Sequence, residues 1–208
     1  MVQKAQGRKG SVTKKDLVTD FRRTEILQAA RRTFSRLGYQ SATVDAIAEE
    51  AGIAKGTVYL YFKSKEEIYL TDLHQYIDAL QEETDARVAK VASAREKLAE
   101  FMAVRLEYCE RNVEFVRIFF SEASVNQMRF HRDFKGFLDH TAKLVQSILD
   151  LGIARGEIRK VPIERTALAI NDLTKGTIER HAMGLIKKRP SEDVNFVVDF
   201  LWSGLERR

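Results

Sequence analysis

Residues 44–61 read VDAIAEEAGIAKGTVYLY, which is the part of the sequence that is most informative about the fold. Two short helices that cross steeply need a small residue where they touch and a tight turn between them, which Ala48 and Gly52 would supply. They also need a compact apolar seam, and five residues have the spacing for it: Ile47, Ala51, Ile53, Val58 and Tyr61. The stretch is therefore predicted to form a helix-turn-helix, with an ordinary helical hairpin as the alternative.

The second helix of this pair, from about Ala54 to Tyr61, has a small, polar and aromatic outer face. Five residues are expected to point away from the seam: Lys55, Gly56, Thr57, Tyr59 and Leu60. A short helix with such a face suits the major groove of DNA. Because Leu60 cannot read bases by hydrogen bonding, sequence choice is expected to depend on few direct contacts and on DNA shape.

Helices are predicted on both sides of the helix-turn-helix. The first spans about Phe21 to Leu37, with Gly38 at the following position, where a positive φ favours glycine. A capping box of Ser64 and Glu67 opens a long helix over about 65–91. Five more helices are predicted over about 94–111, 113–124, 126–155, 163–186 and 192–206. With only two prolines and eleven glycines in the chain, an all-α fold is expected.

Charge is distributed unevenly along the chain. Residues 1–65 hold 13 Lys and Arg against 6 Asp and Glu, whereas the remaining residues hold 22 against 24. A basic end on a near-neutral body is expected where that end meets a polyphosphate, although a merely soluble basic tail would look the same. We predict a flexible basic tail over residues 1–20, a helix-turn-helix domain over residues 21–65 and a helical domain over residues 66–208.

Composition also argues against several classes of protein. Cys109 is the only cysteine, so no internal disulfide can form, which fits a reducing compartment. No apolar run approaches the ~20 residues of a membrane span, and no signal peptide is apparent, so a cytoplasmic location without a membrane partner is expected. The four histidines fit no metal-ligand spacing, and no catalytic motif is found. We therefore predict no enzyme activity, catalytic residue, metal or cofactor.

From Thr24 to Leu73 the sequence resembles the tetracycline-repressor (TetR) family of transcriptional regulators. The resemblance is carried by ILQAARRTFSRLGYQSATVDAIAEEAGIAKGTVYLYFKSKEEIY, above all by residues 51–62 followed by Lys65 and Glu66. It covers about a quarter of the chain, and the remainder is similar only in length and helical layout. The resemblance implies an N-terminal three-helix DNA-binding domain and a C-terminal helical domain for ligand binding and dimerisation.

The resemblance also implies which residues contact double-stranded DNA. Thr43 would contact phosphate at the start of the second helix, and Lys65 would grip phosphate at the start of the long helix. Residues 55–57 would open the recognition helix and meet phosphates and base edges. For Tyr61, packing in the core is as plausible as contact with DNA. The full set is Thr43, Lys55, Gly56, Thr57, Tyr59, Leu60, Tyr61 and Lys65.

The last predicted helix contains VNFVVDFLWSGL at residues 194–205 and is apolar on nearly all sides. Because a surface helix should be apolar on one stripe only, two buried surfaces are expected, one against its own core and one against a partner chain. In the TetR family the last two long helices of each subunit form the dimer interface, so the resemblance implies a homodimer on a palindromic operator. A core helix of a monomer is the alternative.

Polar residues on apolar helix faces indicate a ligand site among the middle helices. Aromatic stripes there are usually part of a core. However, Arg105 and Asn171 each lie on the apolar face of a predicted helix, and a buried polar group without a partner costs ~1–3 kcal/mol. For Arg105, an internal partner such as Glu122 is as plausible as a ligand. The expected lining is Phe101, Arg105, Tyr108, Phe119, Phe134, Phe137, Thr141, Asn171 and Thr174, and the effector would be mostly apolar with one polar or anionic end.

These patterns lead to one main functional expectation. The chain would be a sequence-specific DNA-binding transcriptional regulator, a repressor released from a palindromic operator by a small, mostly apolar ligand. Ligand entry would tilt the helix at 65–91 and move the two reading heads out of register with successive major grooves. The alternatives are a DNA-bound architectural or cell-division control protein without a small-molecule effector, and a helical enzyme or ligand carrier.

Overall fold

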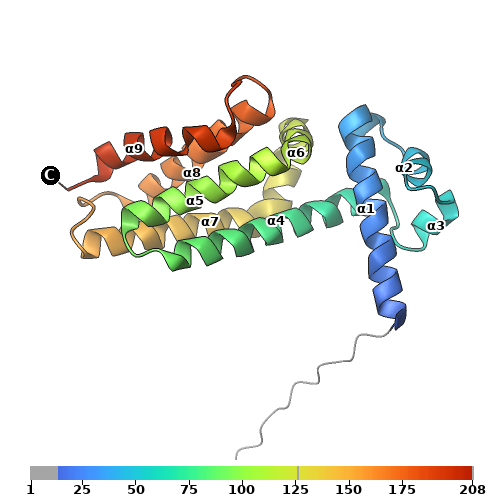
Figure 1. Cartoon of the computed structure of the whole chain (residues 1–208), viewed down its shortest axis with the longest axis horizontal. Coiled ribbons are helices and arrows are strands. Elements are labelled where there is room, and N and C mark those ends of the chain that lie inside the picture. The colour runs from blue at the N-terminus through green and yellow to red at the C-terminus, as the bar shows by residue number, and fades with distance from the viewer. Residues whose placement is uncertain (1–13, 126, 208) are drawn as a thin grey trace, which may run out of the picture. The chain divides into compact units, whose positions relative to one another are not determined.

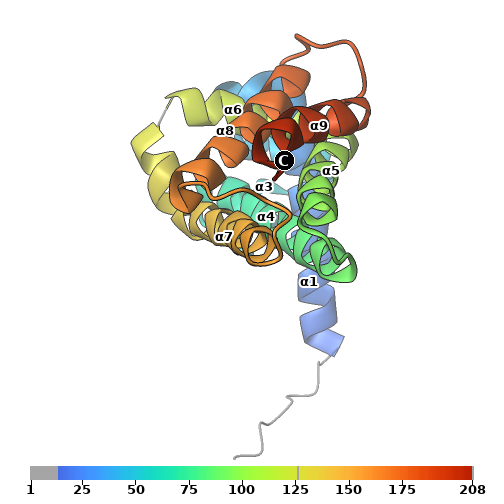
Figure 2. The same ribbon diagram turned by 90° about the vertical axis from the view of Figure 1, so that its left-hand side faces the viewer.

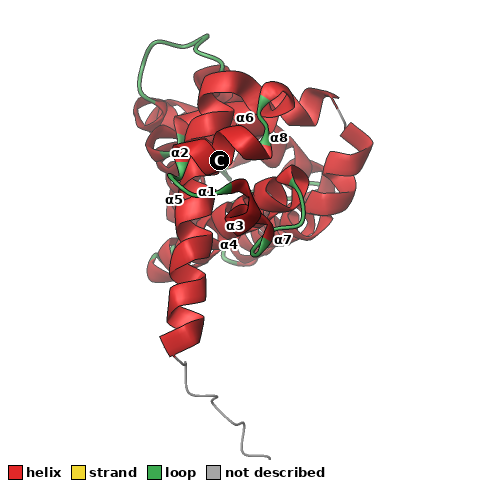
Figure 3. Ribbon diagram, turned by 90° about the vertical axis from the view of Figure 1, so that its right-hand side faces the viewer, coloured by secondary structure: helices red, strands yellow, loops and turns green. Residues whose placement is uncertain are grey.

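The computed structural model of the protein describes residues 14–125 and 127–207, with side chains for residues 17–121 and 134–207. Within these ranges the chain forms helices and loops, and no strand is present beyond one isolated bridge between Ile158 and Glu206 (Figure 3). The helices are α1 (Lys14–Ser41), α2 (Val44–Glu50), α3 (Lys55–Tyr59), α4 (Lys65–Lys90), α5 (Ala94–Arg111), α6 (Val113–Val125), α7 (Gln127–Ala154), α8 (Ile163–Ala182), the 3₁₀ helix η1 (Pro190–Asp193) and α9 (Val194–Leu205). The expected all-α fold is confirmed.

The chain divides into two compact units between Asp72 and Leu73, within α4. The sequence placed this division earlier, at residue 65. The first two turns of α4 belong to the N-terminal unit because they pack there. Ile68 is fully buried, and the Asp72 carboxylate accepts two hydrogen bonds from Arg31 Nε of α1, at 2.7 and 2.8 Å.

In the N-terminal unit, α1 begins at Lys14, seven residues before the expected start. Residues 14–20 are therefore part of a helix and not of the expected tail, whereas residues 1–13 lie outside the described residues. The regular helix breaks at Gly38, whose φ of +75° is the positive value expected after the C-terminus of the first helix. The apolar face of α1 is buried, as its spacing predicts, through Ile26, Leu27, Ala30 and Phe34.

In the C-terminal unit, α5 packs against α7, α8 and α9, and α6 packs against α8 (Figures 1 and 2). The core between these helices contains Phe101 and Met102 of α5, Ile148 of α7, Ile170 of α8 and Val198 of α9. The helix at 163–186 is shorter than expected, because α8 ends at Ala182.

Ion pairs hold the C-terminal part of α4 against α5. Arg87 of α4 pairs with Glu100 and Glu107 of α5, and Arg111 of α5 pairs with Glu83 of α4. Such partly exposed pairs each stabilise a structure by roughly 0–1 kcal/mol. They lie beside the buried stripe of α4, which includes Leu73, Ile77, Leu80 and Val88, and they are consistent with the face that this stripe turns toward the interior.

Candidate DNA interface and ligand cavity

The helix-turn-helix has the geometry that its sequence predicts. Thr43 caps α2, because its Oγ1 accepts a hydrogen bond from Ala46 N at 3.1 Å. Gly52 makes the turn with a φ of +65°, a value that an L side chain adopts only with strain. The seam between α2 and α3 has a buried centre of Ile47, Ala48 and Val58, flanked by the half-buried Ala51, Ile53 and Tyr61.

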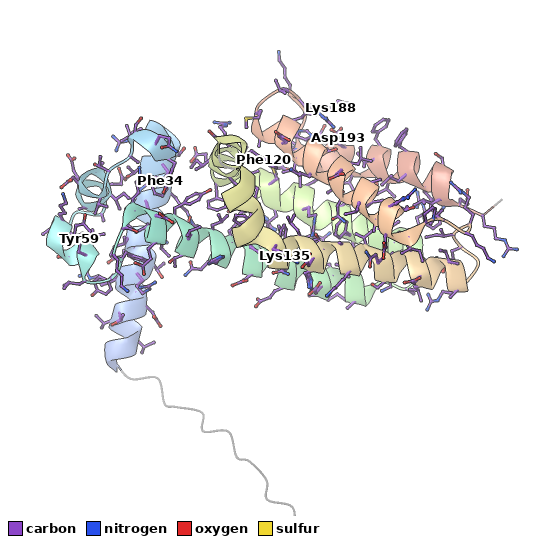
Figure 4. All side chains as sticks on the ribbon, turned by 180° about the vertical axis from the view of Figure 1, so that it is seen from behind. Phe34, Tyr59, Phe120, Lys135, Lys188 and Asp193 are labelled. Atoms are coloured by element: carbon purple, nitrogen blue, oxygen red, sulfur yellow. The ribbon has the colours of Figure 1, made fainter. Side chains whose placement is uncertain are left out.

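The outer face of α3 is open to solvent. Tyr59 is 47% exposed and Leu60 is 80% exposed, and Figure 4 shows Tyr59 at the outer edge of the N-terminal unit. Lys55 and Gly56 are exposed as well, and Thr57 is half-buried. The residues on and directly after α3 that were expected to meet DNA therefore form one accessible surface. Two of them, Tyr59 and Leu60, present a ring and an alkyl group on this surface.

Lys55 has an internal partner that it can readily leave. Its Nζ lies 2.7 Å from Asp45 Oδ2 of α2, and this hydrogen bond raises the pKa of the lysine. Both side chains are well exposed, and exposed ion pairs contribute little to stability. Lys55 is therefore free to exchange this carboxylate for a DNA phosphate.

Lys65 is held differently. Its Nζ donates to the backbone carbonyls of Tyr39, Gln40 and Ala42 at 2.7, 3.1 and 2.9 Å, and it lies 4.5 Å from the centre of the Tyr39 ring. An ammonium has three N–H donors, so all of them are engaged within the unit. This geometry argues against the phosphate contact expected of Lys65 and assigns it to joining the start of α4 to the end of α1.

Arg23 is a residue of this region that the sequence did not single out. It donates to the carbonyl of Tyr61 at 2.7 Å, and its guanidinium lies 4.3 Å from the centre of the Phe62 ring. Phe62 is 1% exposed, so it packs in the interior. The Arg-rich sequence of α1 contains no pattern that distinguishes Arg23 from its neighbours.

The C-terminal unit contains a cavity of about 290 Å³, lined by α4, α5, α6, α7 and α8. Seven of the nine residues expected at a ligand site line it: Arg105, Phe119, Phe134, Phe137, Thr141, Asn171 and Thr174. The lining also includes residues outside that expected set: Tyr76, Ile77, Leu80, Val116, Phe120, Leu138, Ala142, Leu168, Asp172, Lys175 and Ile178. The three members from α4, Tyr76, Ile77 and Leu80, recur at helical spacing in the sequence, but that spacing alone does not distinguish a cavity wall from a packed core.

Phe101 and Tyr108 were expected in the lining but lie behind it. Phe101 is fully buried in the core of the unit, beneath the Arg105 guanidinium. Tyr108 packs its ring edge-on against Tyr76, with 4.7 Å between ring centres. Periodicity places both residues on the correct face of α5, but it does not show which residues of that face a neighbouring side chain covers.

Arg105 is the buried cation of the cavity. It is 6% exposed, its Nη1 donates to Thr84 Oγ1 at 3.1 Å, and its guanidinium carbon lies 4.0 and 5.7 Å from the ring centres of Phe101 and Phe137. Among the described side chains no carboxylate forms an ion pair with it. Glu122, the internal partner considered from the sequence, lies outside those side chains.

Burial lowers the pKa of the Arg105 guanidinium to about 9, because a charge is poorly solvated in an apolar surrounding. The side chain is therefore still a cation at neutral pH. A buried charge is ordinarily paired or bound to a ligand, so Arg105 is the strongest chemical feature of the cavity.

Three other polar groups of the cavity are satisfied by their own helices. Asn171 Nδ2 donates to Ala167 O at 2.9 Å, and Thr174 Oγ1 donates to Ile170 O at 2.8 Å. Thr141 Oγ1 likewise donates to Leu138 O at 3.0 Å. These groups can still accept hydrogen bonds from a ligand, but none of them requires one.

Among the described residues, no group of three or more His, Cys, Asp or Glu side chains is arranged to hold a metal ion. No described helix is long and apolar enough to cross a membrane.

Known proteins share this architecture. Residues 26–71 match the family model described as bacterial regulatory proteins, tetR family. The HTH-type transcriptional repressor AcnR of Corynebacterium glutamicum is 33% identical over 181 residues, which cover 84% of this chain and 89% of AcnR. The fatty acid metabolism regulator protein of Bacillus subtilis is 26% identical over 188 residues, covering 88% of this chain and 95% of that protein.

Solved structures agree with the sequence relatives. FadR of Bacillus subtilis, in complex with stearoyl-CoA, has a TM-score of 0.78 and 25% identity, covering 87% of this chain and 98% of FadR. A putative regulator from Saccharomonospora viridis in complex with choline also has a TM-score of 0.78, with 20% identity and coverage of 91% and 100%. The fold and the helix-turn-helix define a DNA-binding transcriptional regulator. More specifically, the chain belongs to the TetR family.

Proposed function

We propose that the protein is a homodimeric repressor that binds a palindromic operator and is released from it by a small, mostly apolar effector. The observation that carries this proposal is the exposed outer face of α3 on a buried helix-turn-helix seam. Repression is chosen as the sense of regulation because the 33% identical relative is named a repressor, although another relative, FasR of Mycolicibacterium smegmatis, is named an activator.

The proposed DNA contacts follow the exposed surface of the N-terminal unit. They are Thr43, Lys55, Gly56, Thr57, Tyr59 and Leu60, with Tyr61 at the half-buried margin. Lys55 supplies charge, while Thr43 and the start of α3 supply hydroxyl and backbone N–H donors to phosphates. Because this face has few side chains that hydrogen-bond to bases, shape and deformability of the operator contribute much of the specificity. Such a regulator acts in the cytoplasm, where bacterial DNA lies.

The proposed dimer uses the last two helices, and α9 has the two-sided character that this requires. Val197, Val198 and Leu205 are buried in the core of the unit, whereas Phe196 and Phe200 are 71% and 63% exposed and stack on each other. Two large exposed rings on one helix are typical of a protein interface.

The cavity supports an effector. A DNA-bound architectural protein without an effector would be expected to have a filled core, whereas this unit has a cavity close in size to known ligand pockets, roughly 300–1,000 Å³. One helix, α4, contributes residues 65–72 to the N-terminal unit and Tyr76, Ile77 and Leu80 to the cavity wall. A ligand that prefers one position of α4 would thereby change operator affinity.

Selection of bound DNA from a random pool by the full-length protein tests the proposal. An inverted repeat should be enriched, and its binding should weaken steeply as salt rises. The Lys55→Met variant is the matched control, since it should bind the same repeat more weakly. Failure to enrich any motif, or enrichment of a single unrepeated site, would contradict the proposal.

A further inference from the structure

The Arg105 guanidinium has donors to spare inside the cavity. Of its five N–H groups, one is used in the hydrogen bond to Thr84, the single hydrogen bond that Arg105 makes in the described structure. Among the described residues, the fully buried side-chain nitrogen and oxygen atoms that lack a hydrogen-bond partner are Thr33 Oγ1 and His181 Nδ1. The remaining nitrogens of Arg105 make no hydrogen bond and are not among these atoms, so they retain accessible surface beside the cavity that Arg105 lines.

The charges of the lining favour a ligand with one negative charge. Apart from Arg105, the charged residues of the lining are Lys175 and Asp172, which are both exposed on α8. Because these two charges cancel, the cavity has a net charge of +1, located at the buried guanidinium. A planar guanidinium matches a carboxylate, which can accept two parallel hydrogen bonds from it.

The rest of the lining favours an apolar body. Phe119, Phe134 and Phe137 contribute rings from α6 and α7, and Leu80 and Ile77 contribute alkyl groups from α4. The volume of about 290 Å³ lies at the lower end of the range for ligand pockets. This suits a short amphiphile better than a molecule with a large polar portion.

We propose that the effector is a small monocarboxylate whose head group pairs with Arg105 and whose apolar body lies among the rings of Phe119, Phe134 and Phe137. This inference rests on the proposed function, because it names the ligand class of the same cavity. It also explains why a cation is kept in an apolar site: the charge is unfavourable in the empty protein and becomes favourable when a carboxylate neutralises it.

Calorimetric titration of the full-length protein with a matched panel tests the ligand class. The panel comprises octanoate, decanoate, dodecanoate and 4-phenylbutyrate, with 1-decanol and decanoyl-CoA as the alcohol and the thioester that lack a free carboxylate. At least one acid should bind, and decanoate should bind at least 10-fold more tightly than either 1-decanol or decanoyl-CoA. The proposal is overturned if no acid binds, or if 1-decanol or decanoyl-CoA binds as tightly as decanoate.

Two variants test the role of Arg105. Arg105→Met removes the charge but keeps an apolar side chain of similar length, and it should weaken decanoate binding about 10- to 100-fold while leaving 1-decanol binding within about threefold. Lys175→Met, the matched control, removes the other cation of the lining and should bind decanoate nearly as the wild type does. Loss of decanoate binding in Lys175→Met, with Arg105→Met unaffected, would move the head group to α8 and overturn the assignment.

Thermal unfolding without ligand separates ligand recognition from a structural role. If Arg105 is kept for a ligand, Arg105→Met should unfold at the same or a higher temperature than the wild type, and decanoate at about ten times the wild-type Kd should raise the unfolding temperature of the wild type clearly more than that of the variant. A lower unfolding temperature for the empty variant, with the full stabilisation by decanoate retained, would make Arg105 a structural residue. If the variant does not fold, the preference of the wild type for the acid over the alcohol still decides the ligand class.

Failure of this inference is distinguishable from failure of the proposed function, because none of these titrations contains DNA. A protein that binds decanoate through Arg105 but selects no operator would refute the regulator and leave the ligand class standing. A protein that selects an inverted repeat but binds no carboxylate would refute only the ligand class.

Discussion

Two lysines near the helix-turn-helix show how the same residue type acquires different roles. Both were assigned to phosphate from the family resemblance. Lys55 has one exposed carboxylate partner, whereas Lys65 has three carbonyl acceptors at the junction of α1 and α2. The sequence shows the charge of each, but the carbonyls that engage Lys65 come from residues more than twenty positions earlier, and no local pattern reveals them.

Replacing each lysine by methionine should therefore have opposite consequences. Lys65→Met removes three charge-assisted hydrogen bonds and should destabilise the protein by about 1–3 kcal/mol, with the salt dependence of operator binding unchanged. Lys55→Met should leave stability within about 0.5 kcal/mol and reduce the slope of log affinity against log salt by about one unit per subunit. Thermal unfolding and binding titrations at several salt concentrations measure both. A reduced slope for Lys65→Met would restore it to the DNA contacts.

Arg105 leads to a prediction about pH. Between about pH 6 and pH 8 both the Arg105 guanidinium, with its pKa of about 9, and a ligand carboxyl with a pKa near 4.3 are charged, so decanoate affinity should be flat. Below the carboxyl pKa the ligand becomes neutral and the wild type should lose affinity. Arg105→Met should show the reverse, because neutral decanoic acid suits its apolar cavity better. If the decanoate affinity of the wild type and of Arg105→Met changed with pH in the same direction, the result would contradict the proposed pairing of Arg105 with the ligand carboxylate.

The turn between α2 and α3 requires glycine because of its backbone conformation, and not because a side chain would lack room. Added Cβ atoms at Gly52 and Gly56 would meet nothing within 4 Å, but only Gly52 has a positive φ. Gly52→Ala should therefore destabilise the protein by about 1–2 kcal/mol, whereas Gly56→Ala, within α3, should be neutral or stabilise it by up to about 1 kcal/mol. Denaturant unfolding compares them, and equal effects would show that the turn is not strained.

The two faces of α9 should respond differently to charge. The double variant Phe196→Glu and Phe200→Glu changes only the exposed face, so it should fold normally and sediment as a monomer with weak operator affinity. Val197→Glu places a charge in the core of the unit and should instead impair folding. A double variant that still sediments as a dimer would exclude this face of α9 from the interface.

The elements themselves were largely predictable from sequence. Capping signals and helical periodicity placed α4 and α5 within a residue of their observed bounds, because local hydrogen bonds and apolar spacing determine where these helices begin and end. The start of α1 was missed because residues 14–20 have little apolar periodicity, and Leu17 and Val18 remain exposed in the helix. Apolar periodicity arises where one face of a helix is buried, so a helical turn that is solvated on all sides does not show it.

At the scale of the whole molecule, the cavity was predictable in part. Arg105 and Asn171 were recognisable as polar residues on apolar faces, but the contribution of Tyr76, Ile77 and Leu80 depends on how α4 is rotated against α5. That rotation depends on long-range contacts, both the packing of buried residues such as Leu80 and Val88 and pairs such as Arg87 with Glu107. Without them, α4 could be predicted as a linking helix but not as a wall of the cavity.

Two copies of the helix-turn-helix are proposed to read one operator as a unit. The most direct test is to compare the affinity of the full-length protein for the selected inverted repeat with its affinity for a duplex that contains one half-site, at the same salt concentration. The proposed dimer predicts at least 100-fold tighter binding of the inverted repeat, since the second contact becomes intramolecular, and a loss of this advantage in the Phe196→Glu and Phe200→Glu double variant. Equal affinity for the half-site and the inverted repeat would contradict it.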